Sequence, residues 1–280
     1  MSPIGVFDSG YGGLTVLREI RRLMPQYDYL YLGDNARAPY GPRSFERVYE
    51  FTLQAVRHLF DMGCPLIVLA CNTASAKALR SIQQRDLPLL FPSPVASSLP
   101  TRRVLGVIRP TVEAVGELTH TRHVGIVATQ GTVASRTYEL EMAKLHPDIV
   151  VTGQACPMWV PLVENGEADS PGADYFVRRD VQRLLALDPQ IDTIILGCTH
   201  FPLLYNKVRA CTPSSVQLIS QGAYVARSLS DYLCRHSDIE GRLSRSGTAR
   251  FLTTEQPGNF APSAALFLGH AVEAEQISLT

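Results

Sequence analysis

Short apolar runs alternate with longer amphipathic stretches in the first third of the chain. Strand-like runs lie at residues 4–7, 27–32 and 66–70. Each run ends in small or polar residues and leads into a helical pattern. The helical patterns lie at residues 14–24, 44–62 and from 71 to about 84. Three strand–loop–helix units in succession predict a parallel sheet with helices on both faces.

The middle of the chain repeats this alternation. Strand-like runs are expected at residues 104–108, 123–128, 149–154 and 191–196. Helices are expected at residues 111–118, about 135–145 and 173–187, with a loop at 161–166. Further strand and helix material at 216–219, 225–233, 249–253 and 260–268 predicts that the C-terminal tail returns to complete the first domain.

Two pairs of segments indicate an internal duplication. IGVFDSGYGG, from Ile4, resembles VGIVATQGTV, from Val124, and LIVLACNT, from Leu66, resembles TIILGCTH, from Thr193. We therefore expect an α/β fold of two similar, pseudo-symmetric domains that face each other across a cleft, with residues 1–107 plus 217–280 in one and 108–216 in the other. Chance similarity between buried parallel strands is the alternative.

The segment from Leu87 to Arg103 has a different texture. It holds four prolines and four Ser or Thr residues without a usable hydrophobic period. We expect an extended insert or surface loop here, with a mobile lid as the alternative.

Composition narrows the class of partner. The chain has 280 residues, 26 Lys plus Arg and 26 Asp plus Glu, so its net charge gives no basic field for nucleic acid or an anionic membrane. A small molecule or another protein is the expected partner. The N-terminus lacks the zones of a signal peptide, and no apolar run approaches the roughly 20 residues that span a bilayer. We expect a cytoplasmic protein with reduced thiols.

Two of the six cysteines stand at unusual positions. Cys71 and Cys198 each follow a buried strand directly and precede a helical pattern, where helix N–H groups could lower the pKa of a thiol. The other four fit small core residues better, and they are Cys64, Cys156, Cys211 and Cys234.

Proton transfer fits this pair of thiols better than two other kinds of chemistry. Disulfide exchange favours adjacent cysteines, and a metal site needs three or four ligands, whereas only His200 lies close to Cys198 in sequence. If two similar domains face each other, their thiols approach a ligand from opposite sides. Inverting a carbon centre needs a base on one face and an acid on the other.

Polar residues accompany the two cysteines. Asp8 could orient or deprotonate Cys71, receive a substrate ammonium, or merely cap the following helix. His200 could be the proton partner of Cys198 or a structural histidine. Short polar side chains suited to holding carboxylates are Ser9, Asn72, Thr73 and Thr199. Asp34 and Glu164 lie in loops on the same expected rim, where simple solvation is the alternative.

A glycine-rich turn resembles a nucleotide site only superficially. Gly10-Tyr11-Gly12-Gly13 follows a strand, and Asp34 ends the next one. However, the third glycine of the dinucleotide fingerprint falls at Thr15, and Asp8 would repel a pyrophosphate. No G-K-S/T sequence is present, so a P-loop is excluded as well.

Five motifs in order give the chain a resemblance to glutamate racemases, in the cofactor-independent aspartate/glutamate racemase superfamily. They are GVFDSGYGGLTVL at 5–17, YLGDNARAPYG at 31–41, LACNTAS at 69–75, CPMWVPLVENG at 156–166 and ILGCTHFPLL at 195–204. The resemblance implies racemisation of glutamate without cofactor or metal, and a product, D-glutamate, that feeds peptidoglycan synthesis. A homodimer is also expected.

The resemblance implies roles for individual residues. Cys71 would act on the proton of D-glutamate with help from Asp8, and Cys198 on that of L-glutamate with help from His200. Asp8 and His200 would also contact substrate, and the other matches to the substrate shell are Ser9, Pro39, Tyr40, Gly41, Asn72, Thr73 and Thr199. Thr129 and Thr132 match a threonine pair that binds a carboxylate, and Asp34 and Glu164 match acidic positions in supporting roles.

Two departures and two alternatives accompany the resemblance. The segment from Leu87 to Arg103 is longer than is usual in the family. The first motif starts at Ile4, whereas family members that a cell-wall precursor activates tend to carry an extension before it. Activation of that kind is therefore not expected. An enzyme of the same superfamily acting on aspartate or another amino acid would keep both cysteines and differ in the residues that hold the carboxylates. A non-catalytic amino-acid-binding protein would share the cleft without needing paired thiols.

Overall fold

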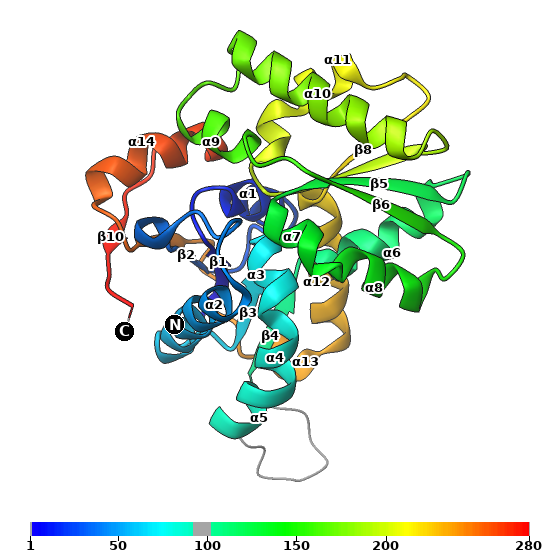
Figure 1. Ribbon diagram of the computed structural model, residues 1–280. Helices are drawn as coiled ribbons and strands as arrows, with labels where there is room; N and C mark the ends of the chain where they lie inside the picture. Colours follow the sequence, from blue (N-terminus) through cyan, green and yellow to red (C-terminus); the bar gives the residue numbers. More distant parts are fainter. Residues whose placement is uncertain (1, 92–101, 280) are drawn as a thin grey trace.

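The computed structural model describes residues 2–91 and 102–279 (Figure 1). The strands are Ile4–Asp8 (β1), Tyr29–Gly33 (β2), Leu66–Leu69 (β3), Arg103–Gly106 (β4), His123–Ala128 (β5), Val150–Ala155 (β6), Thr193–Gly197 (β7), Gln217–Ser220 (β8), Ala249–Thr253 (β9) and Glu275–Gln276 (β10). The α-helices are Gly13–Leu23 (α1), Phe45–Asp61 (α2), Asn72–Lys77 (α3), Leu79–Ser81 (α4), Leu87–Leu90 (α5), Ile108–Leu118 (α6), Gln130–Ser135 (α7), Thr137–Leu145 (α8), Trp159–Glu164 (α9), Pro171–Leu187 (α10), Tyr205–Cys211 (α11), Gly222–Arg235 (α12), Ser237–Glu240 (α13) and Pro257–Leu268 (α14). Shorter helical turns are Asn35–Arg37 (η1), Ile82–Asp86 (η2) and Phe201–Leu204 (η3).

The described strands form two parallel sheets with helices packed around them (Figure 1). The first has the order β10-β9-β2-β1-β3-β4 and the second the order β6-β5-β7-β8. The segment β2-β1-β3-β4 therefore has the same order as the whole second sheet. This confirms the predicted fold class, with two similar α/β halves.

The C-terminal tail completes the first sheet, as its apolar pattern predicts. β9 pairs with β2 in parallel register, and β10 pairs with β9. The predicted boundary between residues 216 and 217 is wrong, however, because β8 pairs with β7 of the second sheet. The chain leaves the second sheet only after Ser220, and the rest of the domain division stays a prediction.

Two segments that were expected to be irregular contain helices. Residues 161–166 were expected to form a loop, but α9 covers most of them. Pro161 is tolerated there because it lies in the first turn, where a backbone N–H has no helical partner. Within the segment from Leu87 to Arg103, the first four residues form α5 and Arg103 begins β4. Residues 92–101 lie outside the described residues.

One hydrophobic core joins the two halves of the molecule. Val6 in β1, Leu17 in α1, Trp159 in α9 and Ile194 in β7 belong to the same cluster of buried side chains. Strands buried on both faces explain the continuous apolar runs in the sequence. This shared core holds the carboxyl ends of β1, β3, β5 and β7 close together. Among residues 2–91 and 102–279, no helix is long and apolar enough to cross a membrane.

Candidate active site

A pocket lies where the two sheets direct their strand ends toward each other. In each sheet the central strand, β1 or β5, has neighbours on both sides that follow it in the chain, which is the arrangement that leaves a crevice at the carboxyl ends. Cys71 follows β3, and Cys198 follows β7. Both cysteines line one cavity of about 180 Å³, a size that suits a small molecule.

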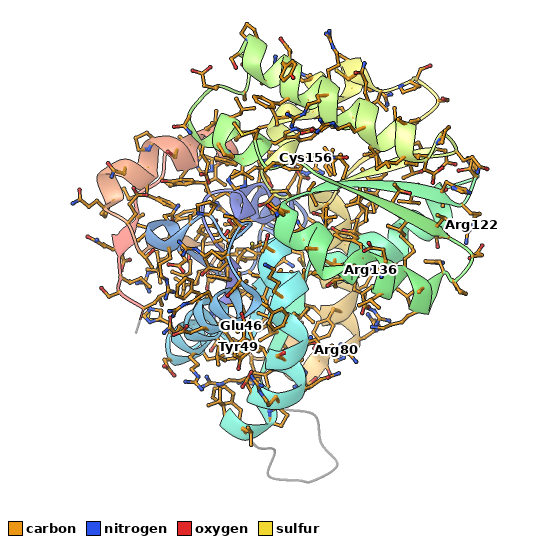
Figure 2. All side chains as sticks on the ribbon, viewed as in Figure 1. Glu46, Tyr49, Arg80, Arg122, Arg136 and Cys156 are labelled. Atoms are coloured by element: carbon orange, nitrogen blue, oxygen red, sulfur yellow. The ribbon has the colours of Figure 1, made fainter. Side chains whose placement is uncertain are left out.

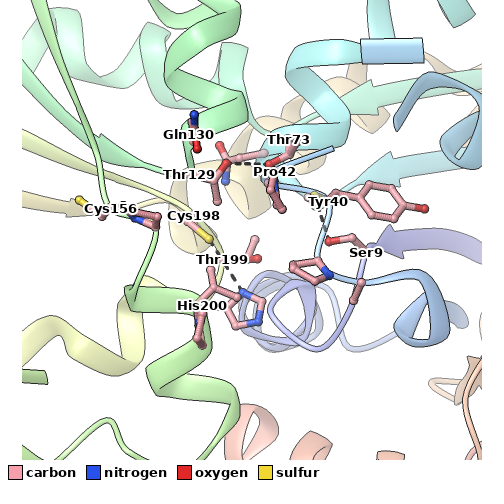
Figure 3. Close-up of a pocket in the computed structure, with 18 of the residues that line it drawn as sticks. Ser9, Tyr40, Pro42, Thr73, Thr129, Gln130, Cys156, Cys198, Thr199 and His200 are labelled. Atoms are coloured by element: carbon pink, nitrogen blue, oxygen red, sulfur yellow. Dashed lines mark hydrogen bonds between the residues drawn. The ribbon is translucent and has the colours of Figure 1, made fainter. Parts of the chain in front are cut away.

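Most of the residues chosen from the sequence line this cavity. They are Ser9, Pro39, Tyr40, Gly41, Cys71, Asn72, Thr73, Thr129, Glu164, Cys198, Thr199 and His200. Figure 3 shows Ser9 and Tyr40 on one side, with Cys198 and His200 across from them. The Tyr40 hydroxyl points away from the cavity and donates a short hydrogen bond to Asp34.

Three other chosen residues lie behind the lining. Asp8 and Thr132 are buried, and each bonds to a lining hydroxyl, from Thr199 and Thr73 respectively. Asp34 was expected on the rim, exposed or ligand-facing, but this is wrong because its carboxylate is fully buried. It accepts hydrogen bonds from Tyr40, Arg37 and Thr254 and so braces the loop that carries the Tyr40 wall.

Cys71 is the N-cap residue of α3 and also lines the pocket. Its Sγ accepts a hydrogen bond from the Ala74 backbone N–H at 3.4 Å, as a helix-capping side chain does. The Ser9 hydroxyl lies 3.4 Å from the same sulfur. The sequence rule that places small polar or thiol groups at helix starts therefore holds at this position.

The expected lowering of the Cys71 pKa is wrong. Burial, and then the nearby negative charge of Asp8, raise the pKa of Cys71 to about 12. The hydrogen bonds from Ser9 and Ala74 oppose this rise but are weaker. Moving a thiolate out of water costs more free energy than one hydrogen bond from a helix N–H restores. Cys71 is therefore a neutral thiol near pH 7.

Cys198 has a different electrostatic partner. Its Sγ lies 3.9 Å from Nδ1 of His200, and Nε2 of His200 lies 2.9 Å from a carboxylate oxygen of Glu164. Burial opposes protonation of the imidazole, but Cys198 and Glu164 outweigh it and raise the pKa of His200 to about 10. His200 is therefore positively charged near pH 7, and an imidazolium stabilises a thiolate placed beside it.

Asp8 is the last residue of β1 and is buried between the two cysteine turns. Its carboxylate accepts hydrogen bonds from the Gly10 N–H at 2.9 Å and from the Thr199 hydroxyl at 3.4 Å. Burial raises the pKa of Asp8, and the charge of His200 opposes the rise. Asp8 does not occupy the N-cap position of α1, which is Gly12, but a hydrogen bond from the N–H of Gly13, the first residue of that helix, also lowers the pKa of Asp8.

Three hydroxyls from both halves of the molecule meet at another wall of the pocket. Thr73 Oγ1 lies 2.9 Å from Thr129 Oγ1 and 3.3 Å from Thr132 Oγ1, and the two latter oxygens are 3.1 Å apart. Thr129 also caps α7 by accepting from the Thr132 N–H. The cluster offers rotatable O–H donors to a carboxylate without a cation.

Sequence reasoning missed part of the lining. The additional lining residues are Ala38, Pro42, Gln130, Cys156, Pro157, Val160 and Pro161. Cys156 comes directly after β6 (Figure 2) and is buried, as its core interpretation predicts, yet it also lines the pocket (Figure 3). The motif CPMWVPLVENG covers four of these positions, but only Glu164 was selected because it alone carries a charge.

Sequence reasoning also missed two polar residues that bond to Asn72. Its Nδ2 donates to Gln221 Oε1 at 2.7 Å, and its Oδ1 accepts from the Tyr138 hydroxyl at 2.8 Å. No local pattern marks either partner, since they lie 149 and 66 residues away in the chain. Within the described residues, no group of three or more His, Cys, Asp or Glu side chains is placed to hold a metal ion.

Comparison with known proteins agrees with this geometry. A model of the Asp/Glu/Hydantoin racemase family matches residues 4–229. A glutamate racemase from Bacillus cereus is 41% identical over 270 residues, which cover 96% of this chain and 94% of the relative. The crystal structure of a glutamate racemase isoform from Bacillus anthracis superposes with a TM-score of 0.87 at 35% identity, covering 99% of this chain and 98% of that one. A glutamate racemase from Francisella tularensis, solved in complex with D-glutamate, gives 0.83 at 30% identity, with coverage of 99% and 98%.

Proposed function

Because this chain belongs to the Asp/Glu/Hydantoin racemase family, we propose that it interconverts L- and D-glutamate with Cys71 and Cys198 as its two acid–base groups and without a cofactor. One observation carries the two-thiol mechanism. Both cysteines line the same small cavity, and each comes from the equivalent strand end of a different half. A racemase needs this two-sided access, since proton removal and return occur on opposite faces of the carbon.

The two thiols have assigned directions in this proposal. Cys198, as the thiolate beside the His200 imidazolium, removes the α-proton of L-glutamate, and Cys71, as the neutral thiol, delivers a proton to the opposite face. The reverse reaction uses Cys71 as the base and Cys198 as the acid. A thiolate at Cys198 further raises the pKa of Cys71, after burial and Asp8, which favours one thiol and one thiolate over two thiolates.

The pocket walls support the carboxylates of the substrate. The hydroxyls of Thr73 and Thr129, backed by Thr132, suit one carboxylate, and Ser9, Asn72 and Thr199 lie close to the two sulfurs. Pro39, Tyr40 and Gly41 also line the pocket, and Gly41 lies against Thr129. These groups hold developing negative charge in a site with little water, where fixed donors act more strongly than in solution.

Solvent deuterium exchange tests the proposed reaction directly. In D2O, the purified protein should bring deuterium to the α-carbon of glutamate while the circular dichroism of L-glutamate decays to zero. L-Aspartate, tested in parallel, should react far more slowly. Binding of glutamate without exchange would instead indicate a non-catalytic binding protein, and faster decay of L-aspartate would indicate a different substrate.

Three further parts of the proposal concern the cell. We expect the protein to supply D-glutamate for peptidoglycan synthesis, to be cytoplasmic and to form a homodimer. Expression in a bacterial strain that requires D-glutamate should restore growth without the supplement, and a Cys71→Ala variant should not. Sedimentation analysis would give the mass of the assembly.

A further inference from the structure

Asn72 is held by a closed ring of buried hydrogen bonds. Its Nδ2 donates to Gln221 Oε1 at 2.7 Å, and Gln221 Nε2 donates to the Tyr138 hydroxyl at 2.8 Å. The Tyr138 hydroxyl then donates back to Asn72 Oδ1 at 2.8 Å. All three side chains are nearly inaccessible to solvent. The ring joins α3, which carries Asn72, to α8 and to the residue before α12.

The direction of every bond in the ring follows from one backbone carbonyl. The Thr111 hydroxyl donates its only proton to the Val107 carbonyl at 2.9 Å, so Thr111 Oγ1 can only accept from Gln221, at 2.9 Å. The nitrogen of Gln221 must therefore face Thr111 and Tyr138, and its oxygen must face Asn72. This fixes the nitrogen of Asn72 toward Gln221 and its oxygen toward Tyr138.

A count of donors and acceptors shows what the ring leaves free. Gln221 uses one N–H on Tyr138 and the other on Thr111, with a longer contact to the Val107 carbonyl at 3.4 Å, and Tyr138 uses its one O–H on Asn72. Asn72 keeps one N–H of Nδ2 and one lone pair of Oδ1. Asn72 lines the pocket directly after Cys71, so these are the groups it can offer to a ligand.

We propose that Tyr138 and Gln221 are positioning residues for the racemase reaction, which lock the Asn72 amide in the one orientation that presents its free N–H and lone pair to the substrate beside Cys71. The proposal rests on the glutamate racemase function proposed above. Without the ring, the amide can rotate by half a turn and exchange its donor for its acceptor. Neither residue lines the pocket, so each acts through Asn72.

A double-mutant cycle tests this. Tyr138→Phe removes one hydroxyl from the ring, and its kcat/KM for glutamate should fall about tenfold, the value of one buried hydrogen bond of about 1.4 kcal/mol. Asn72→Ala should lower kcat/KM by about a hundredfold, since both bonds to the substrate are lost. The kcat/KM of the double variant should lie within about twofold of that of Asn72→Ala, because the effects of two residues that act through each other do not add.

Two further variants keep the test decisive. Tyr29→Phe removes a buried tyrosine hydroxyl that donates to the Met24 carbonyl at 2.7 Å in the first sheet, and it should leave kcat/KM unchanged. If Tyr138→Phe does not fold, Gln221→Met, which removes both of its bonds to the ring, takes its place in the same cycle. The rise in unfolding temperature on adding D-glutamate gives a second readout.

The outcomes separate this proposal from the function on which it rests. Two results would overturn the positioning role. One is a kcat/KM of Tyr138→Phe equal to that of Tyr29→Phe. The other is a double variant whose loss of kcat/KM is the product of the losses of Tyr138→Phe and Asn72→Ala. A wild-type protein that does not racemise glutamate would contradict the proposed function instead. In that case the shift in unfolding temperature with D-glutamate still reports whether Tyr138 and Asn72 are coupled.

Discussion

The two cysteine turns occupy equivalent places in the two sheets but have different surroundings. Cys71 caps α3 and interacts with the Ser9 hydroxyl, the Ala74 N–H and the charge of Asp8. Cys198 is followed by a turn and η3, and its partner is the charged imidazole of His200. Duplication of a fold therefore repeats the backbone position of a thiol without repeating its electrostatics.

The difference gives the two cysteines unequal electrostatic surroundings. Burial and Asp8 raise the pKa of Cys71 and keep it protonated, whereas Cys198 lies beside His200, whose pKa Cys198 and Glu164 raise to about 10 against the effect of burial. In the mechanism proposed above, abstraction from L-glutamate starts from a thiol at Cys71 and a thiolate at Cys198. In the same proposal, abstraction from D-glutamate starts with the proton on Cys198 instead of Cys71.

Replacement of either cysteine gives the largest expected effect and tests which thiol serves which enantiomer. Cys71→Ala and Cys198→Ala should each lower the rate of racemisation by about ten-thousandfold, the upper end of what a proton-transfer group contributes. In D2O, Cys71→Ala should still exchange the α-proton of L-glutamate, and Cys198→Ala that of D-glutamate. Exchange of the opposite enantiomer would reverse the assignment, and near-normal turnover of either variant would exclude the two-base mechanism.

Gly12→Ala should disturb the Cys198 side selectively. A Cβ at Gly12 would lie 2.2 Å from Thr199 Oγ1 and 2.5 Å from His200 Nδ1. His200 must move, and a displacement of about 1 Å can lower a rate by about a hundredfold. We expect kcat/KM to fall by about that factor.

Gly258→Ala is the matched control, since a Cβ there meets nothing within 4 Å. It should leave kcat/KM unchanged and stabilise α14 by about 0.5–1 kcal/mol. Normal activity of Gly12→Ala would mean that the close approach of α1 to His200 is not needed.

Glu164→Gln tests whether the carboxylate keeps His200 charged. Glu164 raises the pKa of His200, so its removal should lower that pKa, and the imidazolium should be lost at lower pH. The alkaline limb of kcat/KM, expected near pH 10 in the wild type, should therefore move toward neutral pH. At pH 8 the loss should be about tenfold, as for a charge-assisted hydrogen bond. An unshifted limb would exclude His200 as the titrating group.

Ser9→Ala should give the smallest effect and reports on the Cys71 side. The Ser9 hydroxyl opposes the rise in the pKa of Cys71, so its loss should raise that pKa further. We expect kcat/KM to fall about threefold, the value of a weak neutral hydrogen bond. The fall must be equal in both directions because the two enantiomers have the same free energy. If Ser9→Ala lowered kcat/KM more than Glu164→Gln does, the polar contacts of Cys71 would matter more than those of His200, which is the reverse of the order expected here.

Local patterns gave most of the strands and both cysteine turns. β5 and β9 begin and end where their apolar runs do. The strand ends at Cys71 and Cys198 were found because an apolar run and the polar residues after it are adjacent in the chain. The assignment of β8 to the first domain was wrong because the sequence of a short strand does not indicate which of the two sheets it pairs with.

The partners of the site residues were harder to find. Gln221 and Tyr138 reach Asn72 only because α3, α8 and the start of α12 converge in the folded chain. Asp34 was taken for a rim residue because a charged side chain in a loop is usually solvated. Its burial depends on Arg37, Tyr40 and Thr254, and the last of these is 220 residues away.

The sequence by itself determined the order of the elements, the duplicated plan and the two thiols at equivalent strand ends, because hydrophobic periodicity and turn residues act over a few positions. Only the tertiary structure decided which groups carry charge. The pKa of Cys71 depends on complete burial, and that of His200 depends on Glu164, 36 residues away. Desolvation and long-range pairing arise only when the two halves pack together, and they give two similar turns different electrostatic surroundings.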